Sequence, residues 1–420
     1  MLLCGALLLE ADTLFRKGLH PLTLVDGYEI ALGACLSQSE SDASPANQEK
    51  LLAVAETALR GKVAETALDH FAPIIVEALT TISENRDDPS AEHVSMKKIG
   101  TGSLIDSRLV KGVVLRKRVL LDSLPNDIFN PNIACLDGDI KIREMTRDAE
   151  IKISKAESLD SFIEAEMNRK NEILESIVKS SAKVILCSGE IDNDILHMLS
   201  ENGILVIGEL DPSELRNASD STGSRIVQSP SEIDKEAIGI CGKATWEKKQ
   251  ASDEVADIIR IEDCPNSSVV TIEVGGAGEA GTEEVIRGIH DSLRATSLAM
   301  KEELLPGAGS IHSRMANAVR VASEKQGGRE RLAMEAFARA LEAIPATLVE
   351  NSGGEPLDKI LELRAIPLDE DFTGVSEDGK ICEVDRTWHP RSVIENSLES
   401  ATETAMGMLR IDQVISARGE

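Results

Sequence analysis

Helical periodicity dominates both ends of the chain. Apolar residues recur there at three- and four-residue steps, which predicts amphipathic helices. The three clearest stripes are Leu2/Leu3/Ala6/Leu9/Thr13, Leu332/Ala333/Ala336/Phe337/Ala340/Leu341/Ile344 and Ile394/Leu398/Ala401/Ala405/Met408. Further helices are predicted over 26–36 and through the stretch 49–82, with a polar linker over 37–47 and a loop over 83–90. The two ends of the chain are therefore expected to be helical.

The pattern changes in the middle of the chain, where short β-branched runs alternate with helical stretches. Strands are predicted over 113–115, 133–136, 151–153, 184–187, 204–207, 225–227 and 269–274, and helices over 159–178, 193–199 and 213–218 and from Thr282 onward. Such alternation is typical of an α/β layer. Helical ends that flank an α/β middle predict a multi-domain α/β fold in which the middle is a nested insertion.

Composition narrows the class of protein. The chain has 420 residues, 42% of them hydrophobic, and a net charge of −28, which predicts two or three globular domains. So negative a surface disfavours nucleic acid and anionic membrane as partners. Seven cysteines without a Cys-x-x-Cys pair indicate neither a disulfide framework nor a zinc site. Most of them lie in apolar runs and are expected to be small buried side chains in a reducing cytoplasm.

The first nine residues imitate a signal peptide but lack its charges. No Lys or Arg precedes the apolar run, and Glu10 and Asp12 follow it at once. The run is also much shorter than the ~20 residues that a membrane span needs. Because a helix with an apolar face begins at the first residue, we expect the chain to be truncated at its N-terminus.

A glycine-rich motif follows the predicted strand 269–274. Gly276, Gly278 and Gly281 match the spacing of a dinucleotide-binding fingerprint, with a strand before and a helix after it. The helix, however, runs into Leu304-Leu305-Pro306-Gly307, which does not predict the second strand of a βαβ unit. A hinge between two domains is the favoured interpretation, because glycine permits the positive φ of a bend.

A second glycine turn, Pro306-Gly307-Ala308-Gly309-Ser310, opens a predicted helix. Backbone amides at a helix N-terminus can bind phosphate oxygens. Asp291 lies one helix upstream, where its carboxylate could orient a water molecule or Mg²⁺. The alternative for Asp291 is an ordinary solvated carboxylate.

Several segments resemble the archaeal thermosome and other group II chaperonins. They are Lys111–Leu115, Val270–Ile272, Ile289–Leu293, Leu305–Gly309, Gly327–Phe337, Ile344–Gly353 and Met408–Ile415, and their order and spacing are kept from end to end. The resemblance covers nearly the whole chain. It implies a three-domain subunit of a double-ring, ATP-driven folding machine, with unfolded proteins and other chaperonin subunits as partners and ATP and Mg²⁺ as cofactors.

The resemblance also implies domain boundaries. Residues 1–55 and 297–420 would form an incomplete helical equatorial domain, and 56–118 with 269–296 a small intermediate domain. Residues 119–268 would form an α/β apical domain with a helical protrusion near 154–179. The protrusion carries the apolar residues Leu159, Phe162, Ile163 and Met167, which either bind unfolded chains or neighbouring lids, or pack the helix on the α/β layer.

By the same resemblance, Asp291 matches a catalytic aspartate that orients water. Gly307, Ala308, Gly309 and His389 would contact ATP. Alanine at 308 and histidine at 389 replace the usual glycine and acidic residue, and the phosphate loop that carries the magnesium ligand is not in this sequence. Two functions therefore stay open: an ATP-dependent chaperonin subunit, and a shortened, non-hydrolysing paralogue that binds clients or ring subunits.

Overall fold

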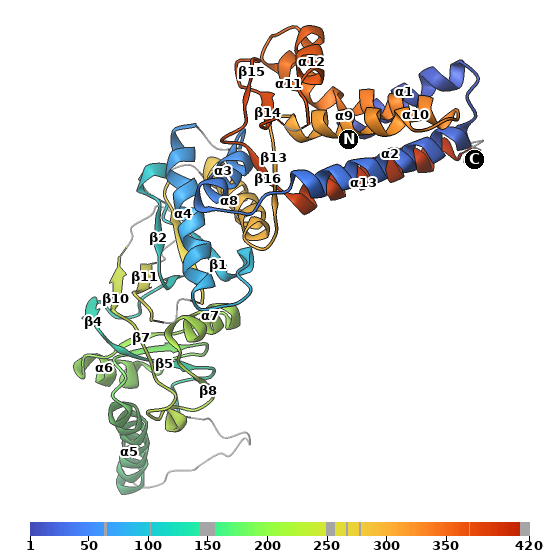
Figure 1. Ribbon diagram of the computed structural model, residues 1–420. Helices are drawn as coiled ribbons and strands as arrows, with labels where there is room; N and C mark the ends of the chain where they lie inside the picture. Colours follow the sequence, from blue (N-terminus) through green and yellow to red (C-terminus); the bar gives the residue numbers. More distant parts are fainter. Residues whose placement is uncertain are drawn as a thin grey trace, which may run out of the picture. The chain divides into compact units, whose positions relative to one another are not determined.

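The computed structural model describes residues 1–62, 65–100, 102–142, 156–248, 257–265, 268–276, 279–368 and 370–411 (Figure 1). The chain forms two compact units. The first joins Met1–Gly61 to Asp291–Glu420, and the second is the intervening stretch Lys62–His290. One unit is thus inserted between the two halves of the other, as the periodicity predicted. A further division of the second unit into intermediate and apical domains stays a prediction.

The first unit is mainly helical. Its helices are α1 Leu2–Arg16, α2 Pro21–Asp42, α3 Gln48–Leu59, the end of α8 Glu279–Ala299, α9 Ser310–Glu324, α10 Glu330–Leu341, α11 Ala343–Asn351, α12 Pro356–Arg364 and α13 Arg391–Leu409. Its strands are β13 Leu304–Pro306, β14 Thr373–Val375, β15 Ile381–Glu383 and β16 Trp388–Pro390. They form the antiparallel pairs β13–β16 and β14–β15.

Helix α2 packs against α9, α10 and α13, and Figure 1 shows it running alongside α13. Tyr28 is fully buried, donates to the carbonyl oxygen of Leu7 at 2.7 Å and meets Phe337 edge to face. A Cβ at Gly27 would lie 2.4 Å from the Cβ of Ala333. Glycine at this position therefore lets α2 and α10 approach closely.

The apolar stripe predicted for the first helix is not its buried face. The buried face of α1 is Leu3, Leu7, Ala11 and Leu14, whereas Leu2 and Leu9 of the predicted stripe are exposed. The face that packs on α10 and α13 is decided by tertiary contact, not by the widest apolar stripe.

Residues 37–42, predicted as linker, continue α2. Their polar side chains have partners in the core: Ser39 Oγ bonds Glu395, and Asp42 accepts two 2.9 Å bonds from the Arg314 guanidinium. Because these groups are paired inside the unit, the helix stays ordered despite its polar sequence.

The described residues of the second unit form three sheets. Its strands are β1 Val94–Lys98, β2 Arg108–Val110, β3 Val113–Lys117, β4 Asp127–Phe129, β5 Asn132–Leu136, β6 Val184–Cys187, β7 Leu205–Ile207, β8 Ile226–Val227, β9 Gly239–Ile240, β10 Lys243–Glu247, β11 Asp257–Glu262 and β12 Val270–Val274. Its helices are α4 Glu65–Ser83, α5 Ala156–Ser180, α6 Asn193–Glu201, α7 Pro212–Thr222, the start of α8 and the 3₁₀ turns η1 Ala91–His93, η2 Leu104–Asp106 and η3 Pro230–Glu232.

The sheet β7-β6-β5-β8 is parallel, with β9 added antiparallel to β5. Strand β6 is buried at all four positions, which agrees with the uninterrupted apolar run predicted for a covered parallel sheet. The other two sheets have the orders β1-β12-β2 and β3-β11-β10-β4. The α/β middle predicted from the alternation is thereby confirmed.

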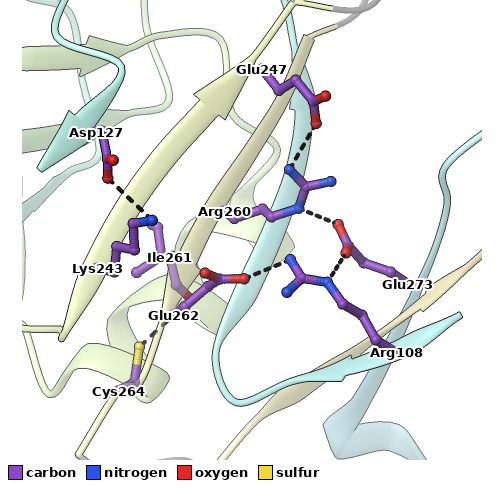
Figure 2. A network of polar contacts seen from close by, with 9 residues as sticks. All are labelled: Arg108, Asp127, Lys243, Glu247, Arg260, Ile261, Glu262, Cys264 and Glu273. Atoms are coloured by element: carbon purple, nitrogen blue, oxygen red, sulfur yellow. Dashed lines mark hydrogen bonds and ion pairs between the residues drawn. The ribbon is translucent and has the colours of Figure 1, made fainter. Parts of the chain in front are cut away.

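A network of charged side chains joins these last two sheets (Figure 2). Glu273 of β12, 1% exposed, accepts from Arg108 Nε of β2 at 2.8 Å and from Arg260 Nε of β11 at 2.7 Å. Each arginine has a second carboxylate partner, Glu262 for Arg108 at 2.7 Å and Glu247 for Arg260 at 3.1 Å. Every charge of the network therefore has an opposite neighbour.

Some predicted elements differ from the observed ones in their bounds or in their type. The helical stretch 49–82 is two helices, α3 and α4, and the strand at 151–153 lies outside the described residues. Residues 304–306 do form a strand, contrary to expectation, but β13 pairs antiparallel with β16 and not with β12. The dinucleotide interpretation of Gly276 to Gly281 is therefore wrong; Gly278 itself lies outside the described residues.

Candidate functional site

A cavity of about 490 Å³ opens beside the turn that precedes α9. All of its lining residues belong to the first unit. The predicted Gly307, Ala308, Gly309 and His389 line it together with Arg60, His312, Ile344, Leu348, Asn351, Ser352, Val375, Ser376, Glu377 and Thr387. The structure thus brings the predicted turn and the predicted histidine to one place.

The turn is held by backbone hydrogen bonds on both sides. Gly307 N donates to Thr387 O at 2.7 Å, and Val375 N donates to Ala308 O at 2.8 Å. Ala308 and Gly309 have φ of +53° and +76°, the left-handed region that glycine favours. Ala308 therefore occupies a position better suited to glycine, at a cost of about 1 kcal/mol. A Cβ at Gly307 would lie 2.9 Å from His389 Nε2. A side chain at this position would therefore collide with the imidazole that lines the cavity.

Two imidazoles contribute to the cavity. His389 comes from β16, opposite Leu305 of β13, and His312 from the first turn of α9. Burial, and secondly the neighbouring His389, lowers the pKa of His312 to about 4, and burial lowers the pKa of His389 as well. Part of the His312 ring faces the cavity, but its Nδ1 is buried without a hydrogen-bond partner. Both rings are neutral at pH 7 and can donate or accept one hydrogen bond at each nitrogen.

The charged lining residues are Arg60 and Glu377, which form an ion pair. Arg60 caps the C-terminus of α3, and Glu377 lies in the turn between β14 and β15. Ser310, the first residue of α9, is fully buried and its Oγ has no hydrogen-bond partner. The N-terminus of this 15-residue helix adds a partial positive charge beside the turn.

Asp291 is not among the residues that line this cavity. It lies exposed on α8, next to Ser292, whose hydroxyl donates to Ala55 O of α3 at 3.0 Å. Of the four apolar residues predicted on the protrusion, Ile163 and Met167 are 52% and 46% exposed on α5. The side chains of Leu159 and Phe162 lie outside the described residues. The catalytic and client-binding roles stay predictions.

The cavity suits a nucleotide better than a bare metal ion. Ile344, Leu348 and Val375 offer apolar contacts to a flat base, and the α9 N-terminus with Arg60 offers positive charge to phosphate. Among the described residues, no group of three or more His, Cys, Asp or Glu side chains could hold a metal ion.

Sequence reasoning missed Arg60, His312 and Glu377. His312 could have been found, because it follows the glycine turn by three residues and so falls in the first turn of the helix. Arg60 and Glu377 are far apart in the chain and have no motif around them. Only the packing of α3 beside the β14–β15 turn brings them together.

Comparisons with known proteins agree on the class. Residues 1–419 match the model of the TCP-1/cpn60 chaperonin family. The chain is 34% identical to a thermosome subunit of Methanopyrus kandleri and 33% identical to the thermosome subunit beta of Archaeoglobus fulgidus, covering 100% of this chain and 78% of each relative. It also resembles the open-state monomer of a group II chaperonin from Methanococcoides burtonii, with a TM-score of 0.64, 25% identity and 98% of each chain covered.

The fold and the cavity define a multi-domain α/β protein with a nested insertion and a ligand site in its helical unit. The chain belongs to the TCP-1/cpn60 chaperonin family. Its similarity in sequence and in fold is to chaperonins of group II, which confirms the resemblance inferred from the motifs. Within the described part of the chain, none of the helices is long and apolar enough to cross a membrane.

Proposed function

We propose that this chain assists protein folding as one subunit of an ATP-dependent, double-ring assembly in the cytoplasm. The observation that carries the proposal is the family match over residues 1–419, because a match of this length includes both the helical unit and the inserted unit. The partners would be unfolded proteins and other chaperonin subunits. The comparisons do not favour the alternative of a shortened, non-hydrolysing paralogue.

ATP would bind in the cavity beside α9. Gly307, Ala308 and Gly309 would approach it through their backbone, and His389 would offer a neutral hydrogen-bonding group to a sugar hydroxyl. Asp291, in the role that the resemblance implies, would orient the attacking water. The bound nucleotide supplies the phosphoryl group, and the protein's part is to position it.

Clients would bind the apical part, proposed to span 119–268, through the exposed apolar face of α5. Ile163 and Met167 are both exposed there and lie four residues apart, hence on one face of the helix. Large apolar side chains that are exposed side by side favour contact with other apolar surfaces. The intermediate domain would comprise 56–118 and 269–296, and the equatorial domain 1–55 and 297–420.

The proposal is tested by light scattering of a chemically denatured client with the full chain present. The wild-type protein should suppress aggregation, and the double variant Ile163→Ser with Met167→Ser should lose most of this effect. Val178→Ser is the matched control, because Val178 is 44% exposed nearer the end of the same helix. Aggregation that the wild-type protein leaves unchanged would reject the folding function. Equal losses in Val178→Ser would reject the assignment to Ile163 and Met167.

A phosphate-release assay tests the second half of the proposal. Turnover that is abolished in Asp291→Ala, with nucleotide binding retained, would support the role of Asp291. If Asp291→Ala turns over ATP as fast as the wild-type protein, the proposed role of Asp291 is rejected.

A further inference from the structure

The ion pair between Arg60 and Glu377 lies where two hollows meet. Both residues line the 490 Å³ cavity. They also line a second hollow of about 390 Å³, whose lining includes Asp378, the next residue of the β14–β15 turn. Each is held on ordered backbone. Arg60 N donates to Glu56 O at 3.0 Å, and the turn after Glu377 is closed by Gly379 N donating to Ser376 O at 3.0 Å. The pair therefore forms part of the cavity wall.

The charges of the cavity lining cancel. Arg60 and Glu377 are the lining residues that carry full charges at pH 7, since both lining histidines are neutral. The single guanidinium of this lining already has an anionic partner. The pair joins Arg60 Nη1 to Glu377 Oε1, so an anionic ligand that binds Arg60 through Nη1 has to replace the Glu377 carboxylate.

Such a replacement is energetically accessible. The Arg60 side chain is 38% exposed and that of Glu377 76% exposed, and ion pairs between exposed side chains contribute little to stability. Phosphate groups carry more charge than a carboxylate and accept two parallel hydrogen bonds from a guanidinium. A released Glu377 carboxylate would be solvated by water, which stabilises its charge.

We propose that Arg60 is a phosphate-binding residue of this cavity and that Glu377 is its internal competitor, which holds the guanidinium until the phosphates of a nucleotide displace it. The inference rests on the proposed function of the cavity as a nucleotide site. It assigns a role to two residues that lie outside every motif of the sequence. Its main consequence is that removing the negative charge of a lining residue tightens binding.

Calorimetric titration of the full chain with ATP and with adenosine tests the proposal. Glu377→Gln should tighten ATP binding by about three- to tenfold, because it removes both the competing ion pair and a repulsive charge. Arg60→Gln should weaken ATP binding by about fivefold or more. Adenosine has no phosphate, so its affinity should change by less than about twofold in both variants.

Two further variants separate displacement from simple charge effects. Asp378→Asn is the matched control, since Asp378 is the next residue in the same turn, is 79% exposed and lines only the second hollow. In the Arg60→Gln background, Glu377→Gln should gain less than about twofold in ATP affinity. A full gain there, or an equal gain in Asp378→Asn, would overturn the displacement model in favour of general repulsion.

The possible failures are distinguishable. If neither ATP nor adenosine binds the wild-type protein or any variant, the nucleotide site itself is rejected. ATP that binds the wild-type protein, but no more tightly in Glu377→Gln, would reject only the role of Glu377. Circular dichroism of each variant confirms that the exposed substitutions leave the fold intact.

Discussion

The network around Glu273 and the cavity beside Gly307–Gly309 differ in whether their buried polar atoms have partners. In the network each arginine contacts two carboxylates, and the buried Glu273 receives both guanidinium groups (Figure 2). In the cavity region, Ser310 Oγ and His312 Nδ1 are buried without partners. Leaving a buried polar atom unpaired costs about 1–3 kcal/mol. The first region is built to hold strands together, and the second keeps unused hydrogen-bonding capacity beside a hollow.

The largest effect is expected at the centre of the network. Glu273→Ala should destabilise the second unit by about 3 kcal/mol, because it leaves two arginine side chains without their shared buried partner. The two tryptophans of the chain fall one in each unit, Trp246 and Trp388. Urea unfolding followed by Trp246 emission in a Trp388→Phe background therefore reports the second unit alone.

Glu247→Gln is the control for this prediction. Glu247 pairs with the same Arg260 but is 60% exposed, so its loss should cost less than about 1 kcal/mol. Equal losses of stability in the two variants would show that the buried Glu273 contributes no more than the exposed Glu247. The network would then not be the stabilising element that its paired charges suggest.

An intermediate effect is expected at His312, and it depends on pH. The pKa of His312 is lowered from 6.5 to about 4 in the folded chain, so below pH 6.5 the unfolded chain binds a proton that the folded chain does not. The stability of the first unit should thus fall between pH 7.5 and pH 4.5, by about 2–3 kcal/mol more in the wild-type protein than in His312→Gln. Unfolding followed by Trp388 emission in a Trp246→Phe background measures this difference.

His20→Asn is the matched control for the pH dependence. His20 is exposed, and asparagine preserves the side-chain acceptor that caps α2. This variant should retain more of the wild-type pH dependence than His312→Gln does. A His312→Gln profile that parallels the wild-type profile would show that the buried imidazole does not carry the effect.

The smallest of the three effects is expected in the glycine turn. Gly309→Ala should destabilise the first unit by about 1–2 kcal/mol, because the residue has φ of +76° and its new Cβ would lie 2.8 Å from the Cβ of Pro345. Gly33→Ala, at an exposed position inside α2 with no atom within 4 Å of the new Cβ, should instead stabilise by about 0.5–1 kcal/mol. Thermal unfolding of both variants gives the two signs directly. A Gly309→Ala variant as stable as the wild-type protein would argue against strain in the turn.

Most helices and strands, and the α/β layer between helical ends, could be predicted from the amino-acid sequence. Fully apolar runs such as Val184–Cys187 predict buried parallel strands, and three- and four-residue periodicity predicts the helices at both ends. The change of period near residue 110 indicated an insertion, but the inserted unit begins earlier, at Lys62. The motifs led to the chaperonin family and to the turn at Gly307–Gly309, because local backbone requirements leave a direct mark on residue types.

Which helix faces and which charged side chains meet depends on contacts between distant segments. Residues 37–42 looked like a linker, yet they are helical because Asp42 and Ser39 find partners on distant helices. The apolar stripe of α1 did not predict its buried face, which the neighbouring α10 and α13 select. Arg60 and Glu377 are ordinary surface residue types in sequence, and their pairing at the cavity depends on contacts between distant segments. Such contacts have no period and no fixed spacing, so nothing in the linear pattern encodes them.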